Sequence, residues 1–142
     1  MNVFNIQRAF EDKKKRNWDR LYWLIDLHHV VIEGRYNRFN RGARIYPGCI
    51  QVFQWFSKRE DMIPILWTSS YNDSINDVLE KLLIYGIRFK YINENPEVDS
   101  DKLCDFSKKL YFNILLDDKA GFEGEKDWSL VKEELMKIGE WE

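Results

Sequence analysis

Cysteine is scarce in this chain of 142 residues, and long apolar runs are missing. The two cysteines, Cys49 and Cys104, have neither the spacing of a metal motif nor that of a disulfide framework. We therefore expect reduced thiols and a cytoplasmic protein. No apolar segment reaches the roughly 20 residues that a membrane-spanning helix needs, which argues against a membrane partner. The first segment carries its charges after a short apolar stretch, the reverse of a signal peptide.

A strong charge imbalance is also missing, because the formal net charge is -2 and the pI about 5.8. The whole chain therefore has no general attraction to nucleic acid. Hydrophobic residues make up 44% of the chain and aromatic residues 15%, which favours a packed core over disorder. No repeat or linker divides the chain, so we expect one domain over residues 1–142, with a helical and basic extension at 1–19.

Apolar runs and helical patterns alternate along the chain. We expect strands at 21–26, 62–67, 87–92 and 110–116, and helices at 3–16, 47–58, 74–86 and 127–139. A short helix or turn is expected at 100–109, and an Arg-rich flap or loop at 33–46. The third long helix should pack Ile75, Val78, Leu79, Leu82 and Leu83 on one face. This alternation predicts an α/β fold, a three-layer sandwich around a mostly parallel, Rossmann-like sheet.

Polar residues follow three of the predicted strands. They are Asp26 after the first strand, the segment 68–70 after the second, and Asp117 and Asp118 after the fourth. Parallel sheets bind ligands outside the carboxyl ends of their strands. Converging carboxylates repel one another, and a hard cation such as Mg²⁺ relieves that repulsion. Taken singly, each residue has an ordinary explanation as a strand end, a turn or a loop; together they predict a magnesium site.

The order of these motifs resembles the haloacid-dehalogenase-like (HAD-like) superfamily of phosphohydrolases, which use an aspartate nucleophile. The first motif matches "LYWLIDLHHVVIEG", the second "PILWTSS", the third a lysine of "SKKLYF", and the fourth "ILLDDKAGF". The segments "YPG" and "GIRFKYINENP" resemble small members without a large cap. The resemblance covers about residues 20–125.

The resemblance implies a Mg²⁺-dependent phosphatase that forms an aspartyl-phosphate on Asp26. Asp26 would also be a metal ligand, together with the backbone carbonyl of His28. Asp117 and Asp118 would hold or orient the metal.

The resemblance also implies a phosphate-binding set. Thr68 and Ser69 would bind the phosphoryl group, and Lys109 or Lys108 would balance its charge. The substrate would be a phosphorylated molecule, and a macromolecule or nucleotide would fit an open site. The sequence leaves the oligomeric state open.

His28 is a departure from most phosphatases of this superfamily, which carry a second aspartate two residues after the nucleophile. Histidine has an unperturbed pKa near ~6.5 and can act as an acid or a base. It can equally be the remnant of an inactive site, or structural. The next residue along the strand, His29, should point the opposite way, into the core or to the surface.

The segment "RYNRFNRGAR" places Arg35, Arg38, Arg41 and Arg44 at every third position, with aromatic residues between them. Arginine and aromatic side chains bind phosphates and stack on bases, so Arg35 and Arg38 are candidates for substrate binding, and nucleic acid is a possible partner. The plainer interpretation is a solvated hairpin whose arginines pair with acidic residues.

Two functions therefore remain open. The first is phosphomonoester hydrolysis with Mg²⁺, and the alternative is a catalytically impaired HAD-like domain that binds a phosphorylated ligand, a nucleic acid or a protein. A receiver domain fits less well, because its acidic pair would follow the first strand. Of the six tryptophans, Trp23 and Trp67 lie within predicted strands, and we expect both in the core.

Overall fold

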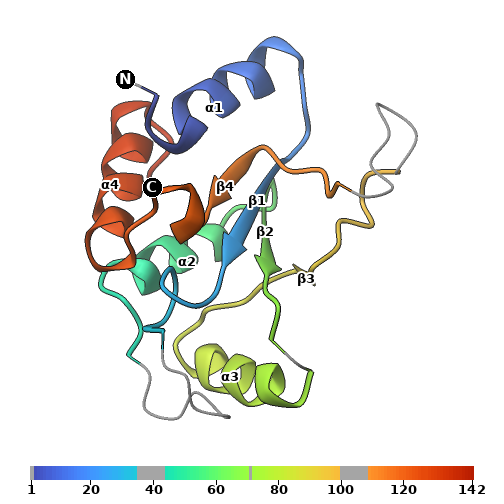
Figure 1. Cartoon of the computed structure of the whole chain (residues 1–142). Coiled ribbons are helices and arrows are strands. Elements are labelled where there is room, and N and C mark those ends of the chain that lie inside the picture. The colour runs from blue at the N-terminus through green and yellow to red at the C-terminus, as the bar shows by residue number, and fades with distance from the viewer. Residues whose placement is uncertain (1, 35–43, 71, 100–108) are drawn as a thin grey trace.

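A computed structural model describes residues 2–34, 44–70, 72–99 and 109–142 (Figure 1). The elements are η1 (Val3–Asn5), α1 (Ile6–Lys15), β1 (Leu21–Asp26), α2 (Cys49–Ser57), β2 (Met62–Trp67), α3 (Asn72–Ile84), β3 (Tyr91–Ile92), β4 (Ile114–Leu116), η2 (Asp118–Ala120) and α4 (Gly124–Lys137). The expected short helix or turn at 100–109 lies outside these ranges except for its last residue.

The four strands form one sheet in the order β3-β2-β1-β4, and all pairs are parallel. β1 and β2 pair over their full length, from Leu21 opposite Met62 to Asp26 opposite Trp67. The predicted α/β fold with a parallel, Rossmann-like sheet is therefore confirmed, and no large cap interrupts it within the described ranges. None of the described helices has the length and apolar character that crossing a membrane requires.

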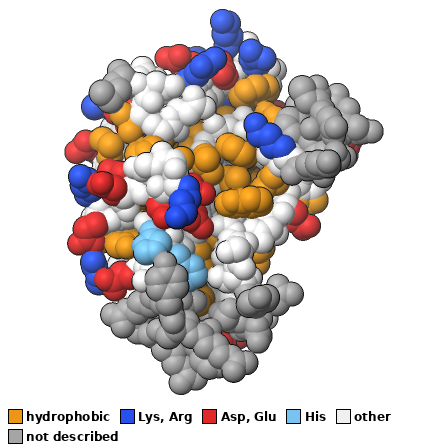
Figure 2. Space-filling view, viewed as in Figure 1, with side chains coloured by type: hydrophobic (Ala, Val, Ile, Leu, Met, Phe, Trp, Pro, Cys, Tyr) orange, Lys and Arg blue, Asp and Glu red, His pale blue; other side chains and the backbone are white. Residues whose placement is uncertain are grey.

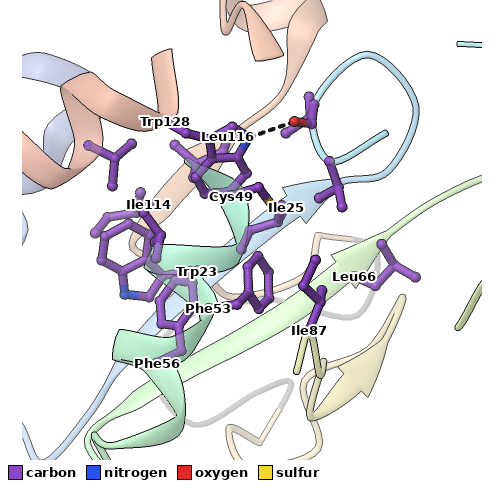
Figure 3. Packing of buried hydrophobic residues seen from close by; sticks show 14 of the residues in the cluster. Trp23, Ile25, Cys49, Phe53, Phe56, Leu66, Ile87, Ile114, Leu116 and Trp128 are labelled. Carbon is purple, nitrogen blue, oxygen red and sulfur yellow. Dashed lines mark hydrogen bonds between the residues drawn. The ribbon is translucent and has the colours of Figure 1, made fainter. Parts of the chain in front are cut away.

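The main hydrophobic core lies between one face of the sheet and the helices (Figure 3). Trp23 and Ile25 of β1 point into it together with Leu66 of β2 and Trp128 of α4. α1 contributes its buried face to the same cluster, so the residues expected as an N-terminal extension belong to the core. Burial of this kind supplies most of the stability of a small domain.

The other face of the sheet carries a smaller cluster. Leu24, Ile63 and Ile65 form its centre, and side chains of the non-helical segment before β4, including Leu110 and Phe112, pack against them. Alternate residues of each strand thus serve the two faces, as pleated strands require.

Two strands are shorter than expected. The ladder of β3 begins only at Tyr91, because Gly86 turns the chain with φ +80° and Ile87 is buried in the main core. Before β4, the Oδ1 atom of Asn113 accepts the Tyr22 N–H at 2.8 Å, while the Asn113 N–H donates to the Tyr22 carbonyl at 2.9 Å. A side chain thus takes the place of a ladder carbonyl, and regular pairing starts at Ile114.

Two burial predictions are wrong. Leu83 is 48% exposed. The buried stripe of α3 consists of Ile75, Val78 and Leu82, and Leu83 lies beside that stripe rather than in it. Trp67 is 43% exposed, because it is the last residue of β2 and β3 already ends at Ile92, the partner of Leu66. By contrast Trp23 is fully buried, as predicted.

Candidate metal centre

Asp26 ends β1 at the carboxyl edge of the sheet. Its side chain is half-buried, and its Oδ1 atom accepts the N–H of Leu27 at 2.9 Å. That hydrogen bond fixes one carboxylate oxygen against the backbone. The Asp26 side chain also hydrogen-bonds with Asp118.

The turn after Asp26 is held by its own backbone and by α4. The carbonyl of Leu27 accepts the N–H groups of Val31 and Ile32, and His29 adopts a left-handed conformation with φ 67°. The indole N–H of Trp128 donates to the Val30 carbonyl at 2.7 Å, the dashed contact in Figure 3. A buried tryptophan therefore anchors the segment that carries the candidate nucleophile.

Asp117 and Asp118 follow β4, the strand on the other side of β1 from β2. The Asp117 carboxylate accepts the Lys119 N–H at 2.8 Å and caps the short helix η2. One oxygen of each carboxylate, from Asp26, Asp117 and Asp118, lies within 4.8 Å of the other two. The three aspartates that the sequence singled out are therefore brought together by the parallel strands, as expected.

The pKa values of Asp26 and Asp118 reflect how close the carboxylates of this cluster lie to one another. Burial, the hydrogen bond with Asp118 and the charge of Asp117 raise the pKa of Asp26 to about 7. Burial acts to raise the pKa of Asp118 too, but its hydrogen bond with Asp26 and the charges of His29 and Lys119 lower it overall. The two adjacent carboxylates therefore shift each other's pKa in opposite directions.

Thr68 and Ser69 follow β2, next to Asp26 along the same edge, because the preceding Trp67 is the partner of Asp26. Asn93 brackets Thr68: its Oδ1 accepts the Thr68 N–H and its Nδ2 donates to the Thr68 carbonyl, both at 2.8 Å. The Thr68 hydroxyl lies 3.1 Å from the Ser70 hydroxyl and 3.1 Å from the Ser70 backbone nitrogen, and Ser69 is exposed. Asn93 is a positioning residue that the sequence reasoning missed; its signal was an asparagine directly after the third predicted strand.

Of the two predicted lysines, the structure describes one, and that one does not join the cluster. Lys108 lies outside the described residues, and Lys109 precedes the amino end of β4, with its Nζ 5.9 Å from the ring centroid of Phe112. The lysine whose charge acts on Asp118 is Lys119. It stands in the fourth motif itself, directly after the acidic pair, where the sequence reasoning did not look for a positive charge.

The Arg-rich segment is described only at its ends. Arg35 and Arg38 lie outside the described residues, so their predicted role stays a prediction. Arg44 pairs with Glu125 at 2.6 Å and with Glu33 at 3.6 Å, and Ile32 and Ile45 form an antiparallel bridge. At its base, therefore, the segment is a hairpin whose arginine pairs with acidic residues.

The two histidines lie in the turn after β1. His28 is half-buried, and the proposed role of its carbonyl as a metal ligand stays a prediction. The exposed ring of His29 packs over Gly34, where an added Cβ would lie 2.0 Å from the ring, and its charge still acts on Asp118. Figure 2 shows the histidine side chains beside acidic and basic side chains and below a patch of hydrophobic ones.

Comparisons with known proteins add one finding. No family model and no curated protein matches the chain. Among solved structures it is similar to a conserved protein of Bacteroides thetaiotaomicron, with a TM-score of 0.61 and 20% sequence identity over 84% of this chain and 91% of that one. At this level of identity, the similarity shows the shared α/β fold alone.

Proposed function

We propose that this protein is a Mg²⁺-dependent phosphomonoester hydrolase that works through an aspartyl-phosphate on Asp26. The observation that carries the proposal is the convergence of Asp26, Asp117 and Asp118 at the carboxyl edge of the sheet. The resemblance of the four motifs to HAD-like phosphohydrolases supplies the reaction.

The donor set fits Mg²⁺. Three carboxylates each offer an oxygen, the ligand type that Mg²⁺ prefers, and Mg²⁺ commonly takes one or two carboxylates plus a phosphate oxygen. Burial and the neighbouring carboxylates raise the pKa of Asp26, so a positive charge at this place would be favourable. When bound there, the metal supplies charge neutralisation for the nucleophile and the phosphoryl group.

The chain's own residues divide the remaining work. A carboxylate oxygen of Asp26 forms a bond to phosphorus while the ester P–O bond breaks, and the leaving oxygen keeps the electron pair and takes up a proton. Water then hydrolyses the aspartyl-phosphate to inorganic phosphate and free Asp26. The Thr68 hydroxyl binds a phosphoryl oxygen, and Asn93 holds the backbone of Thr68 through two hydrogen bonds. Lys119 supplies positive charge next to the acidic pair.

His28 is the residue in this scheme that can deliver the proton to the leaving group. Its presence in place of an aspartate also favours a second candidate function. In that case the chain is an impaired hydrolase that binds a phosphorylated ligand, a nucleic acid or a protein partner without turnover.

Hydrolysis of 4-nitrophenyl phosphate with and without Mg²⁺ tests the proposal. We expect turnover only with Mg²⁺ and a loss of about 10³-fold or more in Asp26→Asn, because an amide cannot form the acyl-phosphate. Asp77→Asn, which changes an exposed carboxylate on α3, is the matched control and should keep full activity. Turnover that survives Asp26→Asn would remove Asp26 as the nucleophile.

A second variant separates the two candidate functions. If His28 is a working acid, His28→Asp should change the pH profile of kcat without a large gain in rate. A gain of about 10²-fold, the usual contribution of a well-placed acid, would show that the histidine impairs the site.

A further inference from the structure

Trp67 differs from the other tryptophans of this protein. Trp23, Trp55 and Trp128 donate hydrogen bonds from their indole N–H groups, Trp18 lies beside the guanidinium of Arg16, and Trp141 stacks on Trp55. Across the described residues, the Trp67 indole has no hydrogen bond, ring contact or cation contact, and the residue is 43% exposed. A large, partly exposed aromatic ring is therefore left without such a partner.

The position of Trp67 sets it apart from other exposed hydrophobic residues. Its Cα is the register partner of Asp26, so the two side chains leave the sheet on the same face. That is the face of Leu24 and Ile65, which precede them by two residues in their strands. Neighbouring strands lie about 4.8 Å apart, so the indole projects from the position next to that of the candidate nucleophile. The next residue is Thr68, which we propose as a phosphate ligand.

We propose that Trp67 selects the leaving group: the substrate is an aryl phosphomonoester, in which a planar aromatic ring is attached to the ester oxygen. This inference rests on the proposed function of Asp26. The open indole stacks on the aromatic ring of the leaving group while the phosphoryl group occupies the acidic site. Pairs of aromatic rings prefer offset or edge-to-face contact at 4.5–7 Å between centroids, a range that one strand spacing allows.

The short distance between the Trp67 and Asp26 positions argues against a nucleotide as the substrate. In a nucleoside monophosphate the ribose separates the base from the phosphate, so the base lies further from the nucleophile than the ring of a phenol. Two sources share the favoured chemistry: a free phenolic phosphate, and a phosphorylated tyrosine side chain in a peptide.

The test compares variants on matched substrates. Trp67→Ala should lower kcat/KM for phenyl phosphate about 10-fold and leave that for glycerol 2-phosphate within about 2-fold, whereas Trp67→Phe should keep most of the preference. Comparing each variant with the parent on the same substrate cancels the different acidities of the leaving groups. Ile92→Ala, which truncates a residue 41% exposed on β3, is the control and should change neither substrate.

A binding measurement makes the result independent of turnover. With Mg²⁺ present, the protein should bind phenylphosphonate about 10-fold tighter than methylphosphonate, and Trp67→Ala should abolish the difference. A phosphotyrosine peptide that binds much tighter than free phosphotyrosine would identify a peptide as the source, and equal affinities would identify the small phenol. Adenosine 5′-monophosphate should be as insensitive to Trp67→Ala as glycerol 2-phosphate.

Three results would overturn the inference while the hydrolase proposal stands. They are an equal loss on both substrates in Trp67→Ala, equal affinity of the parent for the two phosphonates, or a larger effect on adenosine 5′-monophosphate than on phenyl phosphate. If the protein shows no turnover that depends on Asp26, the hydrolase proposal fails. The phosphonate affinities then still decide whether Trp67 binds an aromatic ring.

Discussion

The two ends of the β-sheet hold carboxylates in opposite electrostatic situations. At the amino end, Glu97 lies 2.6 Å from Arg20 and 3.0 Å from Lys90, and the hydroxyl groups of Tyr91 and Tyr22 donate to it at 2.6 and 3.2 Å. Burial alone raises its pKa, but these hydrogen bonds and charges lower it to about 2. Glu97 is therefore a neutralised carboxylate that fastens a loop to the sheet.

At the carboxyl end, three carboxylates converge with no comparable neutralisation. In the ranges that the structure describes, no ion pair joins Asp26, Asp117 or Asp118 to a lysine or an arginine, and the pKa of Asp26 is raised to about 7. The chain thus places Arg20 and Lys90 around Glu97, the carboxylate with a structural role. The difference supports the proposal that the acidic cluster receives most of its positive charge from a bound cation.

The largest expected effect comes from changing one carboxylate at each end. Asp118→Asn should lower Mg²⁺-dependent kcat/KM for 4-nitrophenyl phosphate about 10²-fold, because a proposed metal ligand is lost. Glu97→Gln should stay within about 2-fold of the parent. Steady-state kinetics at saturating Mg²⁺ checks both variants. A larger loss in Glu97→Gln than in Asp118→Asn would contradict the assignment of a catalytic role to the carboxyl end and a structural role to the amino end.

Stability should show the opposite order. Glu97→Gln should lower the free energy of unfolding by about 2 kcal/mol at neutral pH, because charged hydrogen bonds at a side chain only 14% exposed are lost. Urea unfolding of the parent and of Asp118→Asn provides the comparison. Asp118→Asn should be at least as stable as the parent without metal, since it removes like-charge repulsion.

The pH dependence sharpens the same contrast. Folding lowers the pKa of Glu97 from 4.5 to about 2, so its contribution to stability is complete above pH 4.5 and is lost as the pH falls toward 2. The stability difference between the parent and Glu97→Gln should therefore shrink across that window. A difference that stays constant from neutral pH to pH 2 would contradict the assignment of Glu97 as a charged anchor.

The smallest effect is expected from Asn93, which positions Thr68 without touching the substrate. Asn93→Ala removes two hydrogen bonds to the Thr68 backbone and should raise KM about 5-fold while kcat changes less. Asn93→Asp keeps the acceptor for the Thr68 N–H and should fall between Ala and the parent. A pure stability defect, with KM unchanged in the folded variant, would make Asn93 structural only.

The sequence predicts the gathering of the acids because parallel strands end at a common edge. Asp26, Asp117 and Asp118 are adjacent to strand ends, so the topology alone brings them together. The bounds of β1 and β2 were predicted correctly because both strands are nearly continuous apolar runs.

Features that depend on loop geometry were not predictable in this way. The two hydrogen bonds between the Asn93 side chain and the Thr68 backbone require φ 57° at Asn93, directly after β3. No hydrophobic pattern predicts that conformation. Lys119 was overlooked because the resemblance directed attention to a lysine before the fourth strand. Trp67 was expected in the core because sequence does not show that its neighbouring strand ends one residue earlier.

The most direct test of the account is calorimetric titration of the protein with Mg²⁺. The parent should bind one ion per chain, Asp118→Asn and Asp26→Asn should each lose most of the affinity, and Glu97→Gln should bind as the parent does. No binding by the parent, or binding that is unchanged in both aspartate variants, would contradict the claim that these three carboxylates form a metal site.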